Sequence, residues 1–253
     1  MTSFLKIKGI TKQFKLGNGQ IQVLEDICFE VASGELICLI GSSGCGKTTL
    51  LRIIAGLEKQ TTGQIILDDN VVAAAGRERG MVFQEPRLFP WLTLEENVAF
   101  GIKGKVNKTI LQRTVQDLLA MVGLSDFAKA WPHQLSGGMA QRAAIARALA
   151  TDPQILLLDE PFAALDTSTR SKLQTDFLRL WQSTHKTCIH VTHDLEEALI
   201  LGQRIIVMQP SPGRIREIVT IPFTYPRCPE NPDFIALKKR ILDSSVSSTE
   251  IQI

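Results

Sequence analysis

The chain has 253 residues, of which 44% are hydrophobic and 21% are charged, an ordinary composition for a soluble protein with one full α/β core. Its formal charge of +2 argues against a protein that binds nucleic acid through bulk positive charge, so no nucleic-acid partner is expected. No apolar run approaches the ~18 residues of a membrane-spanning helix, and the N-terminus MTSFLKIKGI has no secretory leader, so we expect a cytoplasmic protein.

The first predicted elements are strands. Between residues 4 and 32, apolar side chains surround a polar turn at Leu16 to Gln20, which predicts an antiparallel β flank. Phe14 lies just before that turn, where its aromatic face can stack on an adenine ring. The alternative is a partly buried strand residue that binds nothing.

The stretch GSSGCGKTT, from Gly41 to Thr49, follows the apolar run Leu36–Ile40 and precedes an apolar pattern of helical period. It satisfies G-x-x-x-x-G-K-[ST], a loop whose backbone N–H groups surround phosphates at a helix N-terminus. Lys47 can reach the β- and γ-phosphates, and the Thr48 hydroxyl can bind Mg²⁺. The sequence therefore predicts binding of ATP or a related triphosphate, through Gly41, Ser42, Ser43, Gly44, Cys45, Gly46, Lys47, Thr48 and Thr49.

The five cysteines are odd in number and show no C-x-x-C spacing, which favours reduced thiols in the core over disulfides. Cys45 is the exception. Because a helix N-terminus lowers the pKa of a thiol, we expect Cys45 to react with thiol reagents and to be shielded by a bound nucleotide.

Two further strands are predicted at residues 64–67 and 80–83, and the second ends at Gln84. Large apolar groups then occupy a proline-broken segment that includes Leu88–Leu92. A helix is expected to start at Thr93, because Glu96 three residues later completes a capping box.

An amphipathic helix is predicted over Lys108–Met121, and the glycine turn Leu135–Gly138 opens another over Met139–Ala150. Apolar runs typical of buried parallel strands follow at residues 155–158, 187–191 and 204–208. From Pro210 the chain is expected to be loop-rich until one short helix, Phe234–Leu242. Alternating strands and helices predict a parallel α/β sheet with ligands at the carboxyl ends of its strands.

The strand ILLLDE delivers Asp159 and Glu160 at its carboxyl end. Phosphoryl transfer to water needs a metal ligand and a group that orients the water, and these two acids suit the two tasks. The alternative is a pair of solvated strand-end acids. Neither His133, His185 nor His190 belongs to a metal-ligand grouping, and Trp131 and Trp181 are expected to be packing residues.

These motifs, in this order, resemble those of the ATP-binding subunits of ATP-binding cassette (ABC) transporters. The resemblance covers about residues 4 to 220 and is carried by the Gly41–Thr48 loop, Gln84, the signature Leu135-Ser136-Gly137-Gly138, Asp159-Glu160, Ala164-Leu165-Asp166 and His193. Most other P-loop ATPases, kinases and GTPases lack the LSGG turn, which argues against a P-loop kinase.

The resemblance implies a role for each motif. Glu160 polarises the attacking water, His193 hydrogen-bonds the γ-phosphate, and Gln84 reaches the metal and the water, with Lys47 completing the catalytic set. Thr48, Gln84 and Asp159 would hold Mg²⁺. In this family Ser136, Gly137 and Gly138 face the ATP bound by a second subunit and Asp166 helps to join the copies, so a homodimer with two shared sites is expected.

Three positions depart from the common pattern of the family. Met139 stands where Gln is usual and offers no amide for hydrogen bonding, and Ala140 stands where a basic residue is frequent. Phe14 replaces the commoner Tyr and keeps the aromatic face. Activity is still expected, because Ser136 and Gly138 are intact.

The expected fold is a P-loop NTPase with a RecA-like parallel sheet core, an antiparallel β flank and an inserted helical signature subdomain. We expect an ABC ATPase domain over residues 1–220, with the helical subdomain at about 86–150, and a C-terminal extension with a short helix over 221–253. The cluster Leu88–Leu92 is either core or, as the resemblance implies, a groove for an integral-membrane permease, which we favour.

The segment from Gly76 to Gly101, the SPGRI sequence and the tail FTYPRCPENPDFIALKKRIL resemble the nitrate, sulfonate and taurine importer ATPases. We therefore expect a peripheral protein on the cytoplasmic face of the membrane that energises uptake of a small anion delivered by an extracytoplasmic substrate-binding protein. The alternatives are a pyrimidine-type cargo, an exporter or lipid-extraction system, and a non-transport cassette acting on DNA or ribosomes, which would normally carry tandem cassettes or a basic patch.

Overall fold

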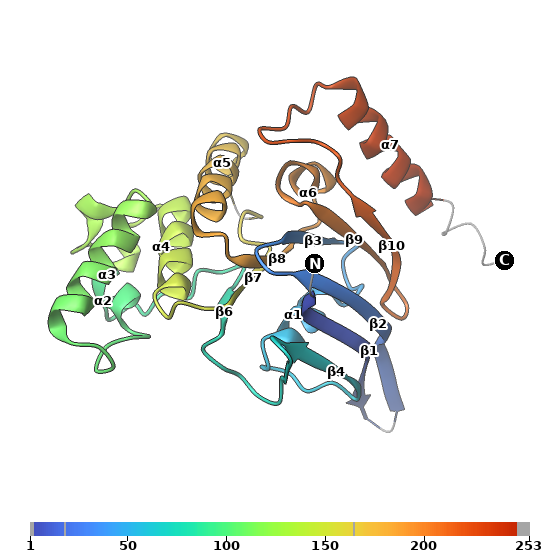
Figure 1. Ribbon diagram of the computed structural model, residues 1–253, viewed down its shortest axis with the longest axis horizontal. Coiled ribbons are helices and arrows are strands. Elements are labelled where there is room, and N and C mark those ends of the chain that lie inside the picture. The colour runs from blue at the N-terminus through green and yellow to red at the C-terminus, as the bar shows by residue number, and fades with distance from the viewer. Residues whose placement is uncertain (1–2, 18, 164, 247–253) are drawn as a thin grey trace.

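The computed structural model describes residues 3–17, 19–163 and 165–246 (Figure 1). Asn18 of the predicted turn and Ala164 of the Ala164-Leu165-Asp166 motif lie outside the described residues. The strands are β1 (Ser3–Leu16), β2 (Gly19–Ala32), β3 (Leu36–Ile40), β4 (Thr62–Leu67), β5 (Asn70–Val71), β6 (Arg79–Val82), β7 (Ile155–Asp159), β8 (Thr187–Val191), β9 (Arg204–Gln209) and β10 (Arg214–Thr220). The helices are α1 (Lys47–Ile54), α2 (Leu94–Ala99), α3 (Lys108–Met121), α4 (Gly137–Leu149), α5 (Thr167–Thr184), α6 (Leu195–Leu201) and α7 (Pro232–Val246), with short 3-10 turns η1 (Ser125–Phe127) and η2 (Pro132–Gln134).

The central sheet has the strand order β10-β9-β3-β8-β7-β6. Its strands from β9 to β6 run parallel, and β3, β7 and β8 are buried along their whole length. Apolar side chains suit strands that are covered on both faces, so the predicted parallel core is confirmed. Four consecutive strands of this sheet, β3, β8, β7 and β6, end beside one another at one edge.

A second sheet, with the order β2-β1-β4-β5, is antiparallel. Its inward side chains, among them Leu5, Ile27 and Ile65, pack with α1 and one face of the central sheet in a single apolar cluster. The expected antiparallel flank is therefore confirmed. It covers the side of the central sheet on which α1 lies.

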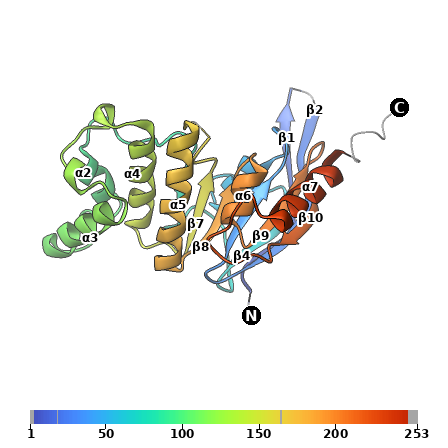
Figure 2. The same ribbon diagram turned by 90° about the horizontal axis from the view of Figure 1, so that it is seen from above.

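Helices α2, α3 and α4 form a group at one end of the molecule, with α5 between them and the sheets (Figure 2). The capping box at the start of α2 is present: Thr93 Oγ1 accepts from the Glu96 N–H, and the Glu96 carboxylate accepts from the Thr93 N–H at 2.8 Å. Helix α3 has the predicted bounds, and α4 begins at Gly137, two residues before the predicted start. None of the described helices is both long and apolar enough to cross a membrane.

The prediction of a loop-rich segment after Pro210 is wrong in part, because residues Arg214–Thr220 form β10 and pair antiparallel with β9. Helix α7 is longer than the predicted Phe234–Leu242. Phe234 and Ile241 are buried in the same apolar cluster as β3 and β7. The division of the chain at residue 220 stays a prediction, and the described part of the tail packs on the main core.

The two tryptophans that were expected to be packing residues differ. Trp181 is buried, and its indole N–H donates to the Lys186 carbonyl at 3.0 Å, as expected. Trp131 is 40% exposed, so that expectation is wrong for Trp131. It precedes η2, a short turn at the surface rather than a helix with an inward face.

Candidate functional site

The glycine-rich loop joins the carboxyl end of β3 to α1, as its sequence predicts. Gly46 caps α1 with φ of 93°, and a side chain there would place Cβ 2.5 Å from Leu24 Cδ2. A second glycine outside the motif, Gly213, lies against the loop: an added Cβ would stand 2.2 Å from the Cys45 carbonyl oxygen. Both positions require glycine because backbone and side chains of β2 approach so closely.

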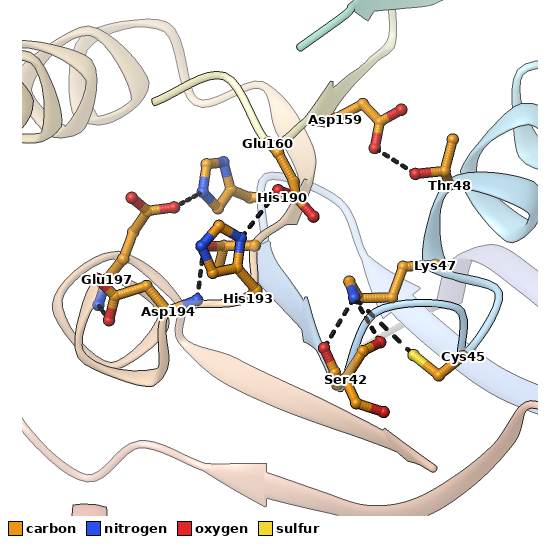
Figure 3. Close-up of polar contacts among 12 residues, drawn as sticks. Ser42, Cys45, Lys47, Thr48, Asp159, Glu160, His190, His193, Asp194 and Glu197 are labelled. Atoms are coloured by element: carbon orange, nitrogen blue, oxygen red, sulfur yellow. Dashed lines mark hydrogen bonds and ion pairs between the residues drawn. The ribbon is translucent and has the colours of Figure 1, made fainter. Parts of the chain in front are cut away.

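The Lys47 side chain folds back onto its own loop. Its Nζ donates to the carbonyl oxygens of Gly41 at 2.8 Å and Ser42 at 3.1 Å, and the residue is only 5% exposed (Figure 3). A buried ammonium without a carboxylate is stabilised by such carbonyls and by any anion that enters the loop. The loop therefore presents one cation and a helix N-terminus to the same point.

Thr48 and Asp159 connect the loop to β7. The Thr48 hydroxyl donates to Asp159 Oδ1 at 2.9 Å, and Asp159 is 6% exposed (Figure 3). Burial raises the pKa of Asp159, although the hydrogen bond from Thr48 opposes this change. The buried carboxylate and hydroxyl are hard oxygen ligands of the kind that Mg²⁺ prefers, so the donor set suits this ion.

Glu160 and His193 meet where β7 and β8 end. His193 Nδ1 lies 2.9 Å from Glu160 Oε2 (Figure 3). Glu160 has φ of 45°, a left-handed conformation that is uncommon for a non-glycine residue, and its N–H donates to the Val191 carbonyl at 3.0 Å. The His193 side chain is 61% exposed and that of Glu160 is 20% exposed, so both can reach a ligand.

One cavity of about 720 Å³ collects most of the predicted residues. Those that line it share one feature, since each follows the carboxyl end of β3, β6, β7 or β8; they are Ser43, Gly44, Gly46, Lys47, Thr48, Thr49, Gln84, Glu160 and His193. Val23 of β2 also lines the cavity, and apart from its place in an apolar strand no sequence pattern indicates this. Gly41, Ser42 and Cys45 belong to the same loop without lining the cavity, and Asp159 lies behind Thr48.

The remaining predicted ligands lie outside this cavity. Phe14 of β1 is 38% exposed, with Lys12 Nζ 4.5 Å from the centroid of its ring, so one face of the ring already carries a cation. Its role in adenine binding stays a prediction.

The signature turn is also separate from the cavity, at the N-terminus of α4. The Ser136 hydroxyl oxygen accepts from the Met139 N–H at 3.3 Å, which leaves its proton free to donate. Gly138 is buried against α5, and an added Cβ would stand 2.9 Å from Thr169 Cγ2. Met139 packs against the apolar core, so the departure from Gln serves packing here. Ser136 and Gly137 are exposed.

The prediction of a reactive Cys45 is wrong. Cys45 is 0% exposed, and burial raises the pKa of its thiol against the opposing effect of Lys47. The local argument from a helix N-terminus fails because the side chain points into the core. All five cysteines are free thiols. Cys38, Cys45 and Cys188 are buried, whereas Cys28 and Cys228 are exposed, so the expectation of a core position is wrong for these two.

Among the described residues, no group of three or more His, Cys, Asp or Glu side chains could hold a metal ion alone. His190 is fully buried and lies with Nε2 2.7 Å from Glu197 Oε1. A Mg²⁺ ion at Thr48 and Asp159 would take its other ligands from an amide, from water and from phosphate oxygens.

Comparisons with known proteins agree with this geometry. The family model described as ABC transporter matches residues 24–163, more than half of the chain. The taurine import ATP-binding protein of Roseobacter denitrificans is 49% identical over 87% of this chain and 82% of its own length. The aliphatic sulfonates import ATP-binding protein of Bacillus cereus is 44% identical over 94% of both chains. A dimeric ATP-binding cassette bound to ADP and Pi in a post-hydrolysis state superposes with a TM-score of 0.77 at 35% identity, over 87% of this chain and all of that one. The chain therefore belongs to the ATP-binding subunits of ABC transporters, which are ATPases coupled to transport.

Proposed function

We propose that this chain is the ATP-hydrolysing subunit of an importer that takes up a small anion such as an aliphatic sulfonate, taurine or nitrate. One observation carries the chemistry: Lys47, Gln84, Glu160 and His193 line a single cavity at the edge of the sheet. The cargo rests on the relatives, of which the aliphatic sulfonate and taurine import proteins are 44% and 49% identical to this chain.

In the proposed reaction the loop from Gly41 to Thr49 holds the triphosphate, with Lys47 at its β- and γ-phosphates. Glu160 accepts a hydrogen bond from the attacking water and orients it. His193, which is held beside Glu160, donates to the γ-phosphate. Positioning of this kind and charge stabilisation supply most of the rate enhancement in phosphoryl transfer.

Thr48, Asp159 and Gln84 are proposed to hold Mg²⁺, which would neutralise charge on the β- and γ-phosphate oxygens. The burial of Asp159 supports this assignment, because a buried carboxylate is costly unless a cation lies near it. Thr48 already donates its proton to Asp159, so both groups point toward the same position.

The proposed working unit is a homodimer. Ser136, Gly137 and Gly138 do not line the cavity of their own chain, and Ser136 and Gly137 are exposed to a neighbour. A second copy would present this turn to the bound nucleotide. The dimeric cassette that superposes on this chain supports the arrangement.

The proposed contact with the membrane permease lies in a groove of about 740 Å³ between the segment after Gln84 and α3. Trp91 is 67% exposed and Phe100 is 54% exposed, and both line the groove with Leu92 and Val115. Exposed aromatic side chains around an apolar groove are typical of a site that receives a helix. The exposure of Trp91 supports the groove over the core alternative for this residue, whereas Leu88 of the same cluster packs against the apolar core. In this arrangement the protein works at the cytoplasmic face of the membrane.

The first test is enzymatic. The variant Glu160→Gln should retain ATP affinity while its steady-state hydrolysis falls by a factor of about 10²–10⁴, whereas Lys47→Ala should weaken ATP binding itself. Arg113→Ala, a change at the surface of α3, serves as a matched control. Normal turnover by Glu160→Gln, or unaltered ATP affinity in Lys47→Ala, contradicts the assigned roles.

The second test identifies the partners. The Glu160→Gln protein with Mg-ATP is used to retain its partners from native membranes, and the co-purifying proteins are identified. A multi-span permease with a receptor that binds taurine, an alkanesulfonate or nitrate supports the importer. A receptor that binds only a pyrimidine reassigns the cargo, and recovery of ribosomes or soluble proteins alone overturns the transport proposal.

A further inference from the structure

Helix α6 starts two residues after the proposed catalytic histidine, His193. Asp194 separates His193 from the first residue of α6 and caps the helix, since its Oδ1 accepts from the N–H groups of Glu196 at 2.8 Å and Glu197 at 3.3 Å. His193 Nδ1 is 2.9 Å from Glu160 Oε2. The position of the N-terminus of α6 therefore determines where the His193 imidazole lies (Figure 3).

The other end of α6 is bound by the C-terminal segment of the chain. Arg227 Nη1 donates to the carbonyl oxygens of Leu199 at 2.6 Å and Gly202 at 2.5 Å. Tyr225 Oη donates to the Leu201 carbonyl at 2.5 Å. The last carbonyls of a helix have no partner within it and carry the negative end of the helix dipole, so a guanidinium is well placed there.

Arg227 is fixed by its own surroundings. Its guanidinium lies 4.2 Å from the centroid of the Tyr225 ring, and its Nε donates to the Phe223 carbonyl at 3.2 Å. Burial lowers the pKa of Arg227, yet an arginine side chain stays protonated at neutral pH. A charged, partly buried side chain thus binds the end of α6 with several directed hydrogen bonds.

The sides of α6 are held as well. Glu197 is 4% exposed and accepts hydrogen bonds from His190 of β8 at 2.7 Å and Gln174 of α5 at 2.9 Å. Glu196 pairs with Lys238 of α7 at 2.6 Å. With seven residues, α6 is about 10 Å long. Glu196 and Glu197 belong to the first turn of α6, so their contacts restrain sideways movement at that end. The hydrogen bonds of Arg227 to the last carbonyls restrain movement along the helix axis, which a short helix passes on to its first residue.

We propose that Arg227 is a positioning residue for His193: by binding the carboxyl end of α6 it keeps the His193 imidazole against Glu160. This inference rests on the proposed role of His193 in hydrolysis and adds a residue from the C-terminal tail to it. Arg227 does not line the nucleotide cavity, so it acts at a distance, through the α6 carbonyls that it binds.

The proposal implies that a change at Arg227 affects the rate of ATP hydrolysis more than it affects ATP affinity. The triphosphate loop follows β3, against which α6 also packs, whereas the hydrogen bonds of Arg227 reach the last carbonyls of α6 and the chain just after it. We therefore expect loss of the Arg227 side chain to displace His193, which precedes α6, more than Lys47. A misplacement of a catalytic group by about 1 Å can cost a factor of about 10² in rate.

The test compares Arg227→Met with Arg240→Met, which removes a 60%-exposed arginine side chain from α7 in the same segment. For Arg227→Met we expect kcat for ATP hydrolysis to fall about tenfold while ATP affinity changes less than twofold. Arg240→Met should match the wild type in both. Arg227→Lys, which keeps the charge and loses the forked geometry, should fall between them.

A spectroscopic measurement distinguishes a local displacement of His193 from a loss of structure throughout the protein. The chain has only four histidines, so histidine-selective NMR resolves each imidazole after assignment by substitution. The His193 signal should shift in Arg227→Met, and the His133 signal, on η2 among the other helices, should not.

Several results overturn the inference. It fails when kcat of Arg227→Met equals that of wild type, when the His193 signal does not move, or when ATP affinity falls together with kcat and all four signals shift. If Arg227→Met does not fold, the same criteria apply to Arg227→Lys. Absence of ATPase activity in the wild-type protein would refute the proposed function instead, while the NMR comparison still decides whether Arg227 positions His193.

Discussion

The buried pair of His190 and Glu197 allows a quantitative test of the packing behind the reaction site. His190 is 0% exposed and Glu197 is 4% exposed, with 2.7 Å between Nε2 and Oε1. Gln174 donates to the second carboxylate oxygen at 2.9 Å. His190 Nδ1 is buried without a hydrogen-bond partner, which is tolerable for an imidazole that carries its proton on Nε2.

The substitution His190→Leu removes one donor from a buried carboxylate. Removing a hydrogen-bond partner from a buried group costs about 1–3 kcal/mol of unfolding free energy, and the charge on the carboxylate argues for the upper end, about 3 kcal/mol. The same cost is expected for Glu197→Leu, because it leaves the His190 N–H buried without an acceptor. For a chain of this size the thermal midpoint should fall by about 6–12 °C in each single variant.

The double variant His190→Leu/Glu197→Leu should recover most of this loss. The imidazole lies near Phe162 and Phe177, with ring centroids 5.5 and 6.2 Å away, so a leucine pair enters an apolar environment. A residual cost of about 1–2 kcal/mol is expected because the Gln174 amide loses its acceptor.

The assay is unfolding by heat and by urea, followed by circular dichroism, on the wild type and the three variants. A double variant that is more stable than either single variant supports a coupled pair. A cost near the sum of the two single values, about 6 kcal/mol, would refute the reasoning, because it would mean that the two side chains act independently.

Four further outcomes are expected. Arg147→Met removes hydrogen bonds of 2.6 and 2.9 Å to the carbonyls of the loop after Gln84; ATP affinity of the isolated subunit should stay within about twofold, whereas stimulation of hydrolysis by the permease should fall about tenfold. Gly46→Ala places Cβ 2.5 Å from a leucine methyl group and should abolish ATP binding in titration calorimetry. Alkylation of the native protein, followed by mass spectrometry, should label the two exposed cysteines and spare Cys45. Burial opposes ionisation of Glu197, but hydrogen bonds, the largest of them from His190, outweigh this effect and hold the pKa of Glu197 below its usual 4.5. The stability that results is complete above pH 4.5 and is lost as the pH falls through the lowered pKa. The urea midpoint should therefore drop less on acidification in Glu197→Gln than in the wild type.

The parallel core could be predicted from sequence because its signals are local. Runs such as Leu36–Ile40 and Ile155–Asp159 are apolar at every position, and burial on both faces of the sheet demands that. Strand β10, Arg214–Thr220, was missed because it lies at the edge of the sheet and alternates charged with apolar residues after a proline. The first six residues of α5 are polar, and its apolar positions Leu173, Phe177, Leu180 and Trp181 recur at helical spacing only after these six. Helix α6 is only seven residues long, which is too short for a clear periodic pattern.

The part of the site that sequence could not predict depends on contacts between distant residues. Arg227 follows Leu199 by 28 positions, and no pattern around either residue indicates that a guanidinium binds that carbonyl. Cys45 is the converse case, in which a local pattern predicts a property that packing with distant residues removes. A local argument from the helix N-terminus predicts a reactive thiol, and the packing of β2 and β9 around the loop buries it.

The arrangement of the site follows from the order of strands in the sheet. Lys47 follows β3, His193 follows β8, Glu160 follows β7 and Gln84 follows β6, and these strands are consecutive neighbours in the order β3-β8-β7-β6. Neighbouring strands lie about 4.8 Å apart, so these four proposed site residues, from distant parts of the sequence, are spread over about 14 Å.

The same order explains why binding and hydrolysis can be perturbed separately. Because β8 stands between β3 and β7, His193 is adjacent to both the phosphate loop and Glu160 while belonging to neither. Helix α6 is the direct continuation of the β8 loop, and the C-terminal tail contacts α6 rather than α1. If the proposed role of Arg227 is correct, a change in the tail reaches His193 before it reaches Lys47, because α6 follows His193 directly while it only packs against β3. The tail would then set the rate of hydrolysis with little effect on nucleotide affinity, which is the outcome that the Arg227→Met comparison measures.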